Sequence, residues 1–303
     1  MSAHGSNPTK AIMYAFFANL GVAIAKAVAA YFTGSSSAIA EVCHSVADCG
    51  NQLLLLLGIK RAQKAADKEH PLGYGKATYF WSFMVAILLF SVGGLFSVYE
   101  GVHKLSSPEP MSHAWILIVV LVLSIIFEGI SLRGCLVEIK KERGERTLRE
   151  WIKHTRSSEL LVILGEDYAA QIGLFIALGF VLLAVITGNP VYDAIGSICI
   201  GVLLVIVAVF ISIKVKALLI GRSADPQTVA KIKAVIAKDD DVLELFNAVT
   251  LQMGPKALLA MKIRMREDMP VGAAARAINE LERDIKVSIP DIGWCFIEID
   301  VAD

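Results

Sequence analysis

The sequence is poor in charge and has no excess of either sign. Charged residues make up 19% of its 303 residues, and 29 lysines and arginines balance 29 aspartates and glutamates. Average soluble proteins carry about 25% charged residues, and nucleic-acid-binding proteins usually show a basic excess. The composition therefore argues against a nucleic-acid partner. What remains is strongly apolar, since 55% of the residues are hydrophobic.

Paired cysteines and a secretory leader are also missing. The five cysteines occur singly within apolar stretches, with no CxxC pair, which indicates reduced and buried thiols rather than disulfides. The first ten residues, MSAHGSNPTK, lack the basic stretch of a signal peptide, and no small-residue cleavage site follows the apolar segment after them. We therefore expect that segment to stay in the mature protein.

The chain has six long apolar stretches instead. A helix rises ~1.5 Å per residue, so about 20 apolar residues cross the ~30 Å hydrocarbon core of a bilayer. The stretches of this length are 11–32, 38–59, 78–102, 114–132, 160–186 and 191–213. The sequence therefore predicts an α-helical membrane protein, with a six-helix transmembrane domain over residues 1–221.

Basic residues are concentrated in two connections between these stretches. Residues 60–76 contain five lysines and arginines and residues 135–157 contain seven, whereas the alternate connections contain only Lys104. Loops rich in lysine and arginine stay on the cytosolic side of a membrane. We expect both termini in the cytosol, with the inner cell membrane as the membrane of residence.

Residues 222–303 predict a soluble α+β domain with the order αββαβ, of the ferredoxin or metallochaperone-like kind. Asp225 is a helix N-cap residue followed by proline. Apolar residues alternate with polar ones over 249–253, 259–265 and 295–301, which is typical of half-buried strands. We expect this domain to dimerise, with regulatory or partner-binding roles as alternatives.

Ionisable residues within the apolar stretches are the main functional signal. Each costs ~2.5–3.5 kcal/mol on membrane-insertion scales, so few persist without a function. His44 and Asp48 are four residues apart and share one helix face, where an imidazole nitrogen and a carboxylate oxygen can hold a divalent ion. Glu166 and Asp167 lie in the fifth stretch, with no basic residue nearby. The pattern predicts a metal site between the second and fifth spans; polar packing between helices is the alternative.

Two motifs resemble those of the cation diffusion facilitator family of metal transporters. They are TGSSSAIAEVCHSVAD (33–48) and EHPLGYGK (69–76), and the likeness extends to Asn19 and Lys26 and to the C-terminal domain. The resemblance implies a homodimeric secondary transporter rather than an enzyme. Such a protein exchanges a cytosolic divalent cation, most often Zn²⁺, for protons by alternating access. Zinc is then the substrate and not a permanently bound cofactor.

The family's transport site takes two ligands from the second span and two from the fifth. His44 and Asp48 match the first pair, and Asp167 matches the acidic ligand of the second pair. Ile163 stands where the family usually has histidine. The stretch LGEDYAA resembles a branch of the family with an acidic pair at this point, which makes Glu166 the candidate fourth ligand.

The sequence does not decide which group is the fourth ligand or which metal ion is transported. Glu166 projects ~100° away from Asp167 on an ideal helix, so water and Asn51 compete with it. One nitrogen with several oxygens is a hard ligand set, which keeps Mn²⁺, Fe²⁺, Co²⁺ and Cd²⁺ as alternatives to Zn²⁺. Because Ile163 replaces the family's histidine, a second function is an alternative: a non-transporting subunit that dimerises with an active relative. A channel is a weaker alternative, because ligands that grip an ion favour stepwise carriage.

The family's second metal site lies in the loop between the second and third spans. Asp67 and His70 match two of its ligands, but Tyr74 replaces the third, so we expect a weak site or none. A histidine that only shapes the turn before Pro71 is the alternative. The C-terminal domain has no histidine, which argues against a stable binuclear zinc site there.

Two features outside these sites carry weaker expectations. Glu128 in the fourth span is expected to have a structural role. Trp151 and His154 in the second basic connection predict an interfacial helix, with the tryptophan at the depth of the lipid headgroups.

Overall fold

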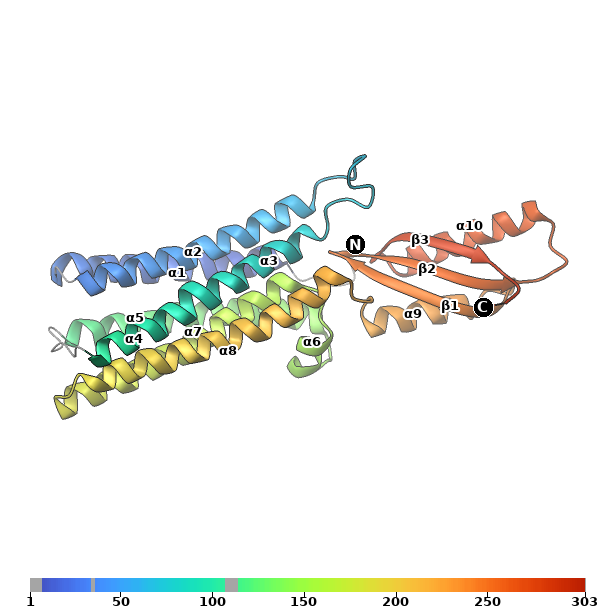
Figure 1. Ribbon diagram of the computed structural model, residues 1–303. Helices are drawn as coiled ribbons and strands as arrows, with labels where there is room; N and C mark the ends of the chain where they lie inside the picture. The colour runs from blue at the N-terminus through green and yellow to red at the C-terminus, as the bar shows by residue number, and fades with distance from the viewer. Residues whose placement is uncertain (1–6, 34–35, 107–113, 303) are drawn as a thin grey trace.

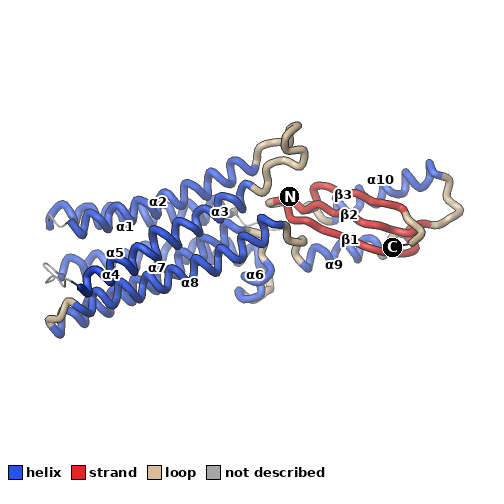
Figure 2. Tube along the Cα trace, viewed as in Figure 1, coloured by secondary structure: helices blue, strands red, loops and turns tan. Residues whose placement is uncertain are grey.

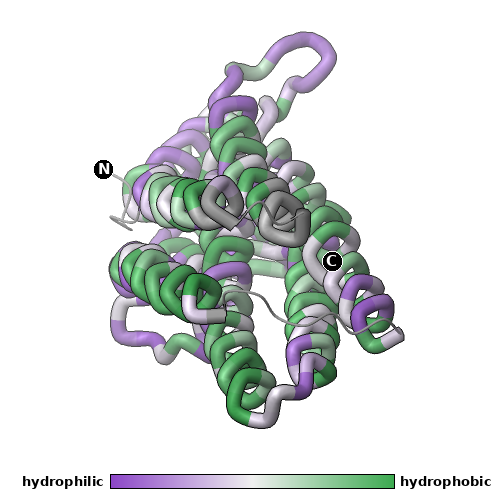
Figure 3. The backbone as a smooth tube through the Cα atoms, turned by 90° about the vertical axis from the view of Figure 1, so that its left-hand side faces the viewer, coloured by the Kyte–Doolittle hydropathy of each residue, from purple (hydrophilic) through white to green (hydrophobic). Residues whose placement is uncertain are grey.

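The computed structural model describes residues 7–33, 36–106 and 114–302, apart from some side chains, chiefly near the start of the second helix. An elongated bundle of long helices lies end to end with a small domain that contains a sheet (Figure 1). The bundle helices are hydrophobic along most of their length, and the longer loops are hydrophilic (Figure 3). This arrangement is that of an integral membrane protein with a separate C-terminal domain.

Five helical stretches are long and apolar enough to cross a membrane: Pro8–Val28, Ala77–Ser106, Trp115–Arg143, Ser158–Thr187 and Val191–Ile220. They correspond to α1 (Pro8–Thr33), the consecutive helices α3 (Ala77–Leu88) to α4 (Phe96–Ser106), α5 (Ala114–Arg143), α7 (Ser158–Thr187) and α8 (Val191–Ile220). The second predicted span forms α2 (Ser36–Ala62), which is not among the five in this count over the described residues. The helical bundle is confirmed, and the sixth span stays a prediction.

The third span is longer and less regular than the sequence predicts. It runs through α3 (Ala77–Leu88), a π-helical segment η1 (Leu89–Leu95) and α4 (Phe96–Ser106). Glycines let this span approach α8 closely: a Cβ atom on Gly94 would lie 2.6 Å from Cγ2 of Val205. Small residues at such interfaces are a common way to pack helices in membranes.

Several helices continue beyond their apolar stretch toward the C-terminal domain. The fourth span was predicted to end at residue 132, but α5 continues to Arg143 because Cys135 and Ile139 are still buried against the bundle. The short helix α6 (Leu148–His154) follows, and Thr147 and Glu150 form its capping box. Helix ends therefore project past the apolar zone and reach the soluble domain.

The C-terminal domain has the predicted αββαβ order. Its elements are α9 (Pro226–Ile236), β1 (Val242–Met253), β2 (Lys256–Met265), α10 (Val271–Ser288) and β3 (Ile292–Ile299). The sheet order is β1-β2-β3, with β1 and β2 antiparallel and β2 and β3 parallel (Figure 2). Leu259 and Ile263 of β2 pack with Ile232 of α9 and Leu281 of α10. Both helices therefore cover one face of the sheet, and no helix of the described residues covers the other face.

The two domains meet at a glycine contact. Gly75 precedes α3, and Gly254 lies in the turn between β1 and β2 with a φ of +78°. A Cβ atom on either residue would collide with the backbone beside the other, so both positions require glycine. The buried Tyr79 donates a hydrogen bond to the carbonyl oxygen of Gly254 at 3.1 Å. The tip of the sheet is thereby fixed against the helical bundle.

Candidate metal-transport site

Glu166 of α7 is buried and faces α2. Nδ2 of Asn51 donates to its Oε1 at 3.2 Å, and Nε2 of Gln52 donates to its Oε2 at 2.9 Å. Both donors are neutral amides on successive positions of α2. A buried carboxyl group is costly without hydrogen bonds, and these two bonds satisfy it without neutralising it with a cation.

Asp167, the next residue of α7, faces a different helix. Its Oδ2 accepts a hydrogen bond from Oγ of Ser131 on α5 at 2.9 Å, and its side chain is buried. The two acidic side chains therefore point toward α2 and α5, as the ~100° step between neighbouring helix residues predicts. They form an acidic pair in sequence, but each has its own set of partners.

Glu128 of α5, expected from sequence to have a structural role, lies in the same region of the bundle as these acidic groups. It is buried, lies one turn from Ser131, and interacts electrostatically with Asp48, Lys26 and Asp167. Asp48 and Glu128 also act on Glu166. Carboxyl groups from α2, α5 and α7 therefore share one region of the bundle. The spacing of Glu128 and Ser131, three apart in an otherwise apolar stretch, is the signal that could have revealed this face of α5.

The predicted ligands are only partly brought together. Asp48 is half-buried on α2, one turn from Gln52, whereas the side chain of His44 lies outside the described residues. Among the described side chains, no three His, Cys, Asp or Glu groups are close enough to hold a metal ion. Ile163 is fully buried among apolar residues and offers no ligand. The set His44, Asp48, Glu166 and Asp167 therefore stays a prediction.

Three buried polar atoms in the same helices have no hydrogen-bond partner among the described residues. They are Oε1 of Gln52, Oγ of Ser124 and Oε1 of Gln171. Ser124 lies one turn beyond Glu128 on α5, and Gln171 lies one turn beyond Asp167 on α7. Unpaired buried oxygens are rare in proteins and mark places where a ligand or a rearrangement can supply the partner. Polar groups thus continue along α5 and α7 from Asp167 toward the end of the bundle away from the sheet domain.

The predicted loop site contains a cation of its own. Nζ of Lys64 lies 2.9 Å from Oδ2 of Asp67 and donates to Oη of Tyr74 at 2.8 Å, and the tyrosine hydroxyl donates to the same carboxylate oxygen at 2.7 Å. These hydrogen bonds hold the pKa of Asp67 well below its usual range. The ring of His70 lies 4.2 Å from that of Tyr74. One carboxylate oxygen that a metal would use is thus already bound by an ammonium group.

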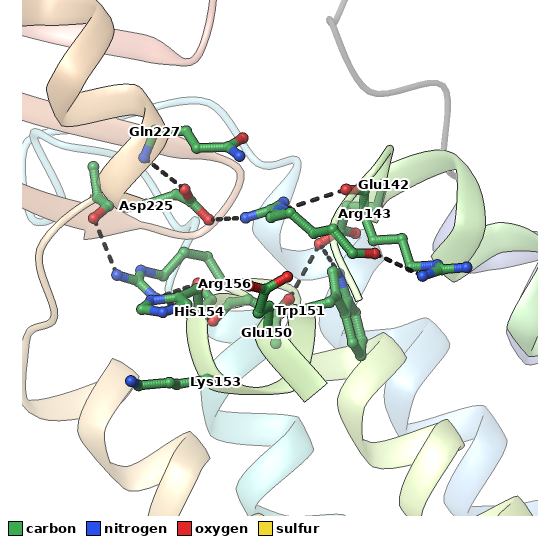
Figure 4. A network of polar contacts seen from close by, with 12 residues as sticks. Glu142, Arg143, Glu150, Trp151, Lys153, His154, Arg156, Asp225 and Gln227 are labelled. Carbon is green, nitrogen blue, oxygen red and sulfur yellow. Dashed lines mark hydrogen bonds and ion pairs between the residues drawn. The ribbon is translucent and has the colours of Figure 1, made fainter. Parts of the chain in front are cut away.

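Trp151 is enclosed by protein, and its depth relative to the lipid headgroups stays a prediction. Trp151 is fully buried, and its Nε1 donates to Oε1 of Glu142 at 2.9 Å (Figure 4). Oγ1 of Thr155 and Oγ of Ser157 also donate to the carboxylate of Glu142, at 3.1 and 2.7 Å. The partly buried acid at the end of α5 requires donors, and folding α6 back onto α5 supplies three of them.

Residues 12–220 match the family model described as cation efflux transmembrane domain, and residues 224–302 match that of the cation efflux protein cytoplasmic domain. The chain belongs to the cation diffusion facilitator family. The second family model is also consistent with dimerisation of the sheet domain.

The chain is similar to several named proteins, which differ in their identity to it and in coverage. Metal tolerance protein C4 of Arabidopsis thaliana is 36% identical over 74% of the chain and 50% of its own length. The mitochondrial proton-coupled zinc antiporter SLC30A9 of Mus musculus is 32% identical over 82% of the chain and 44% of its own length. Manganese efflux system protein MneP of Bacillus subtilis is 23% identical over 96% of the chain and 95% of its own length. The chain spans about half the length of the first two relatives.

Proposed function

We propose that this protein exports a divalent cation, Zn²⁺ in the first place, in exchange for protons. The observation that carries the proposal is the gathering of carboxyl groups from α2, α5 and α7 inside a membrane-spanning bundle, where Glu166 and Asp167 are held by neutral donors alone. Acidic groups at this depth are costly, and a cation that passes between them accounts for their presence.

The neutral donors suit an exchange of cations. Metal ligands must be deprotonated, so protons and metal ions compete for the same oxygens, and a proton gradient can drive metal release. Amide and hydroxyl groups stabilise a carboxylate without removing its charge. In the proposed cycle Asp48, Asp167 and His44 bind the metal, with Glu166 as fourth ligand, and Asn51, Gln52 and Ser131 hold the carboxyl groups between turnovers.

Zinc is proposed first because the predicted set includes one imidazole, which suits Zn²⁺. A zinc antiporter is among the relatives, and so is a manganese efflux protein. Manganese is the second candidate on chemical grounds too, because three of the four predicted ligands are carboxylates. A flux assay in which Zn²⁺ and Mn²⁺ compete decides which of the two is the preferred substrate.

We further propose that the basic loops and the sheet domain lie in the cytosol and that two chains dimerise through that domain. The helix-free face of the sheet supports this part. Val249 and Phe296 are both paired with Ala260 across the strands, and each is 57% exposed. An exposed apolar row of this kind is more favourable when a second copy covers it. We expect the inner cell membrane as the location.

The test is metal flux into proteoliposomes that contain the purified chain, with an imposed pH gradient. Uptake of Zn²⁺ is expected to rise with the gradient and to collapse when a protonophore is added. The variant Asp48→Asn is expected to lose uptake. Glu100→Gln is the matched control, because Glu100 lies on α4, pairs with Lys104 at 3.2 Å and is more than a third exposed. Undiminished flux in Asp48→Asn contradicts the site.

A non-transporting subunit is the competing function, favoured by the buried Ile163 at the position of the expected histidine. The same assay separates the two. Folded wild-type protein that moves none of Zn²⁺, Mn²⁺, Fe²⁺, Co²⁺ and Cd²⁺ alone, but restores flux to an inactive relative, is the subunit.

A further inference from the structure

Four basic side chains gather where the bundle meets the sheet domain. They are Lys153 on α6, Arg156 two residues after the end of α6, Lys214 on α8, and Arg222 two residues after the end of α8. Nη2 of Arg222 donates to the carbonyl oxygen of Lys153 at 2.7 Å, and Lys214 interacts electrostatically with the other three. We call these four residues the joint cluster. Segments about 60 residues apart in sequence form it, so folding alone brings the charges together.

The joint cluster is held in place by neutral backbone groups. Nε of Arg156 donates to the carbonyl of Ser223 at 2.7 Å, and its Nη2 donates to that of Ala224 at 3.0 Å. Figure 4 shows Arg156 within this network and the Lys153 side chain extending away from it. Carbonyl oxygens orient the guanidinium groups but leave their charge uncompensated.

Acidic partners for the joint cluster are missing among the described residues. None of its four members forms an ion pair there, and the nearby Asp225 is paired with Arg146 at 2.6 Å. Burial and the neighbouring Arg222 lower the pKa of Arg156 to about 10. Asp225 also acts on Arg156, but it is already paired with Arg146, so the four cations keep an excess of positive charge that attracts an anion from outside.

The joint cluster borders the surface that faces lipid. Lys214 shares a helix face with Phe210, which is four residues before it and 44% exposed, and its neighbour Ile213 is 58% exposed. Its Nζ lies 5.6 Å from the centroid of the Phe210 ring. The aliphatic part of Lys214 therefore runs along an apolar surface while its charge reaches the level of the headgroups.

We propose that the joint cluster binds the phosphate group of an anionic phospholipid. Arginine and lysine side chains are the usual partners of phosphate groups, and basic pockets at the ends of transmembrane helices bind anionic headgroups. A phospholipid fits better than free phosphate, because its acyl chains can lie along Phe210 and Ile213. The bound lipid also connects α6, α8 and the first residues of the sheet domain through Arg156 and Arg222.

The test uses the purified full chain in detergent, with native mass spectrometry to count bound lipid and thermal unfolding as a second measurement. Phosphatidylglycerol is expected to bind and to raise the unfolding temperature, and phosphatidylcholine is not. The double variant Lys153→Gln/Lys214→Gln is expected to bind phosphatidylglycerol about thirtyfold more weakly, for two lysines that each contribute about 1 kcal/mol. Both lysines are chosen because, in the described part of the chain, neither side chain donates a hydrogen bond that connects the helical bundle with the sheet domain.

The matched control is Lys60→Gln/Arg61→Gln, which removes two exposed charges at the end of α2 that faces the sheet domain. The control is expected to keep phosphatidylglycerol binding. Equal weakening in both double variants means general surface attraction and overturns the proposal. Inorganic phosphate that protects against unfolding at the same concentration as phosphatidylglycerol, and competes with it, overturns the assignment to lipid. A variant that unfolds in detergent is compared by the lipid that copurifies with it from membranes.

Discussion

Two regions of this molecule use carboxyl groups in opposite ways. In the bundle, Glu166 and Asp167 accept hydrogen bonds from amides and a hydroxyl. In the loop between α2 and α3, Asp67 accepts hydrogen bonds from the ammonium group of Lys64 and from a tyrosine. The sequence predicts metal ligands in both regions, but the acids of the bundle are held by neutral donors, whereas the acid of the loop is paired with a cation.

The difference shows that the partner of a carboxylate decides its use as much as its position does. A neutral donor lowers the cost of burial and can be exchanged for a metal ion, since no opposite charge has to leave. An ammonium group already supplies the positive charge, so a divalent ion must displace it. Lys64 thus performs in the loop the charge-balancing role that a bound metal would have there.

The largest expected change in zinc flux comes from a comparison of two variants: Asp167→Asn in the bundle and Asp67→Asn in the loop. The first removes a charge that the proposed mechanism needs, so zinc flux is expected to fall to the level of protein-free liposomes. The second removes one partner from an exposed ion pair, and such pairs contribute little, so flux is expected to change less than about twofold. Flux in proteoliposomes checks both. Similar losses in the two variants contradict the distinction between the regions.

The next largest effect concerns the neutral donors. Gln52→Leu keeps the size of the side chain but removes the amide that donates to Glu166. Groups that orient metal ligands typically change metal affinity by about 10–100-fold when removed. We expect the zinc concentration for half-maximal flux to rise by about tenfold. The control is Gln63→Leu in the exposed loop after α2, which should leave that concentration unchanged.

Glu128 tests whether the polar region extends to α5. Glu128→Gln keeps the shape of the side chain and removes one negative charge from the group that includes Asp48 and Asp167. We expect maximal zinc flux to fall about tenfold, which corresponds to ~1.4 kcal/mol, while the variant keeps its unfolding temperature. A variant with normal flux shows that Glu128 is only part of helix packing, which is the role expected from sequence.

The fold was predictable from sequence to a greater extent than the site. Apolar length located the helices, and alternation located the strands, because burial imposes both patterns directly. The continuation of α5 to Arg143 was missed because its last turns pack against protein and soluble segments instead of lipid, and there polar residues are tolerated. The burial of Trp151 was missed for a related reason: a tryptophan beside basic residues is typical of a membrane surface, but here Glu142 binds its indole nitrogen.

The candidate site shows where sequence reasoning stops. Helix periodicity correctly separated the directions of Glu166 and Asp167. Asn51 was named beside Glu166 only as a competing ligand, and Gln52, Ser131 and Glu128 were not named as neighbours, since these contacts depend on how α2 and α5 pack around α7. The Lys64 to Asp67 pair was missed because lysine in a basic connection was interpreted only as an orientation signal.

The smallest expected effect on transport comes from rebuilding the loop. The double variant Lys64→Gln/Tyr74→His removes the internal cation and adds an imidazole beside Asp67 and His70. Three ligands of types that zinc prefers then lie in one short loop, and calorimetry with zinc is expected to detect one additional site relative to wild type. Flux should change less than about twofold, because the loop is outside the transport pathway. Lys68→Gln/Tyr74→His is the control, since it keeps the Lys64 to Asp67 pair. If this control gains the site equally, the ammonium group of Lys64 is not what prevents metal binding, and the contrast between loop and bundle needs another cause.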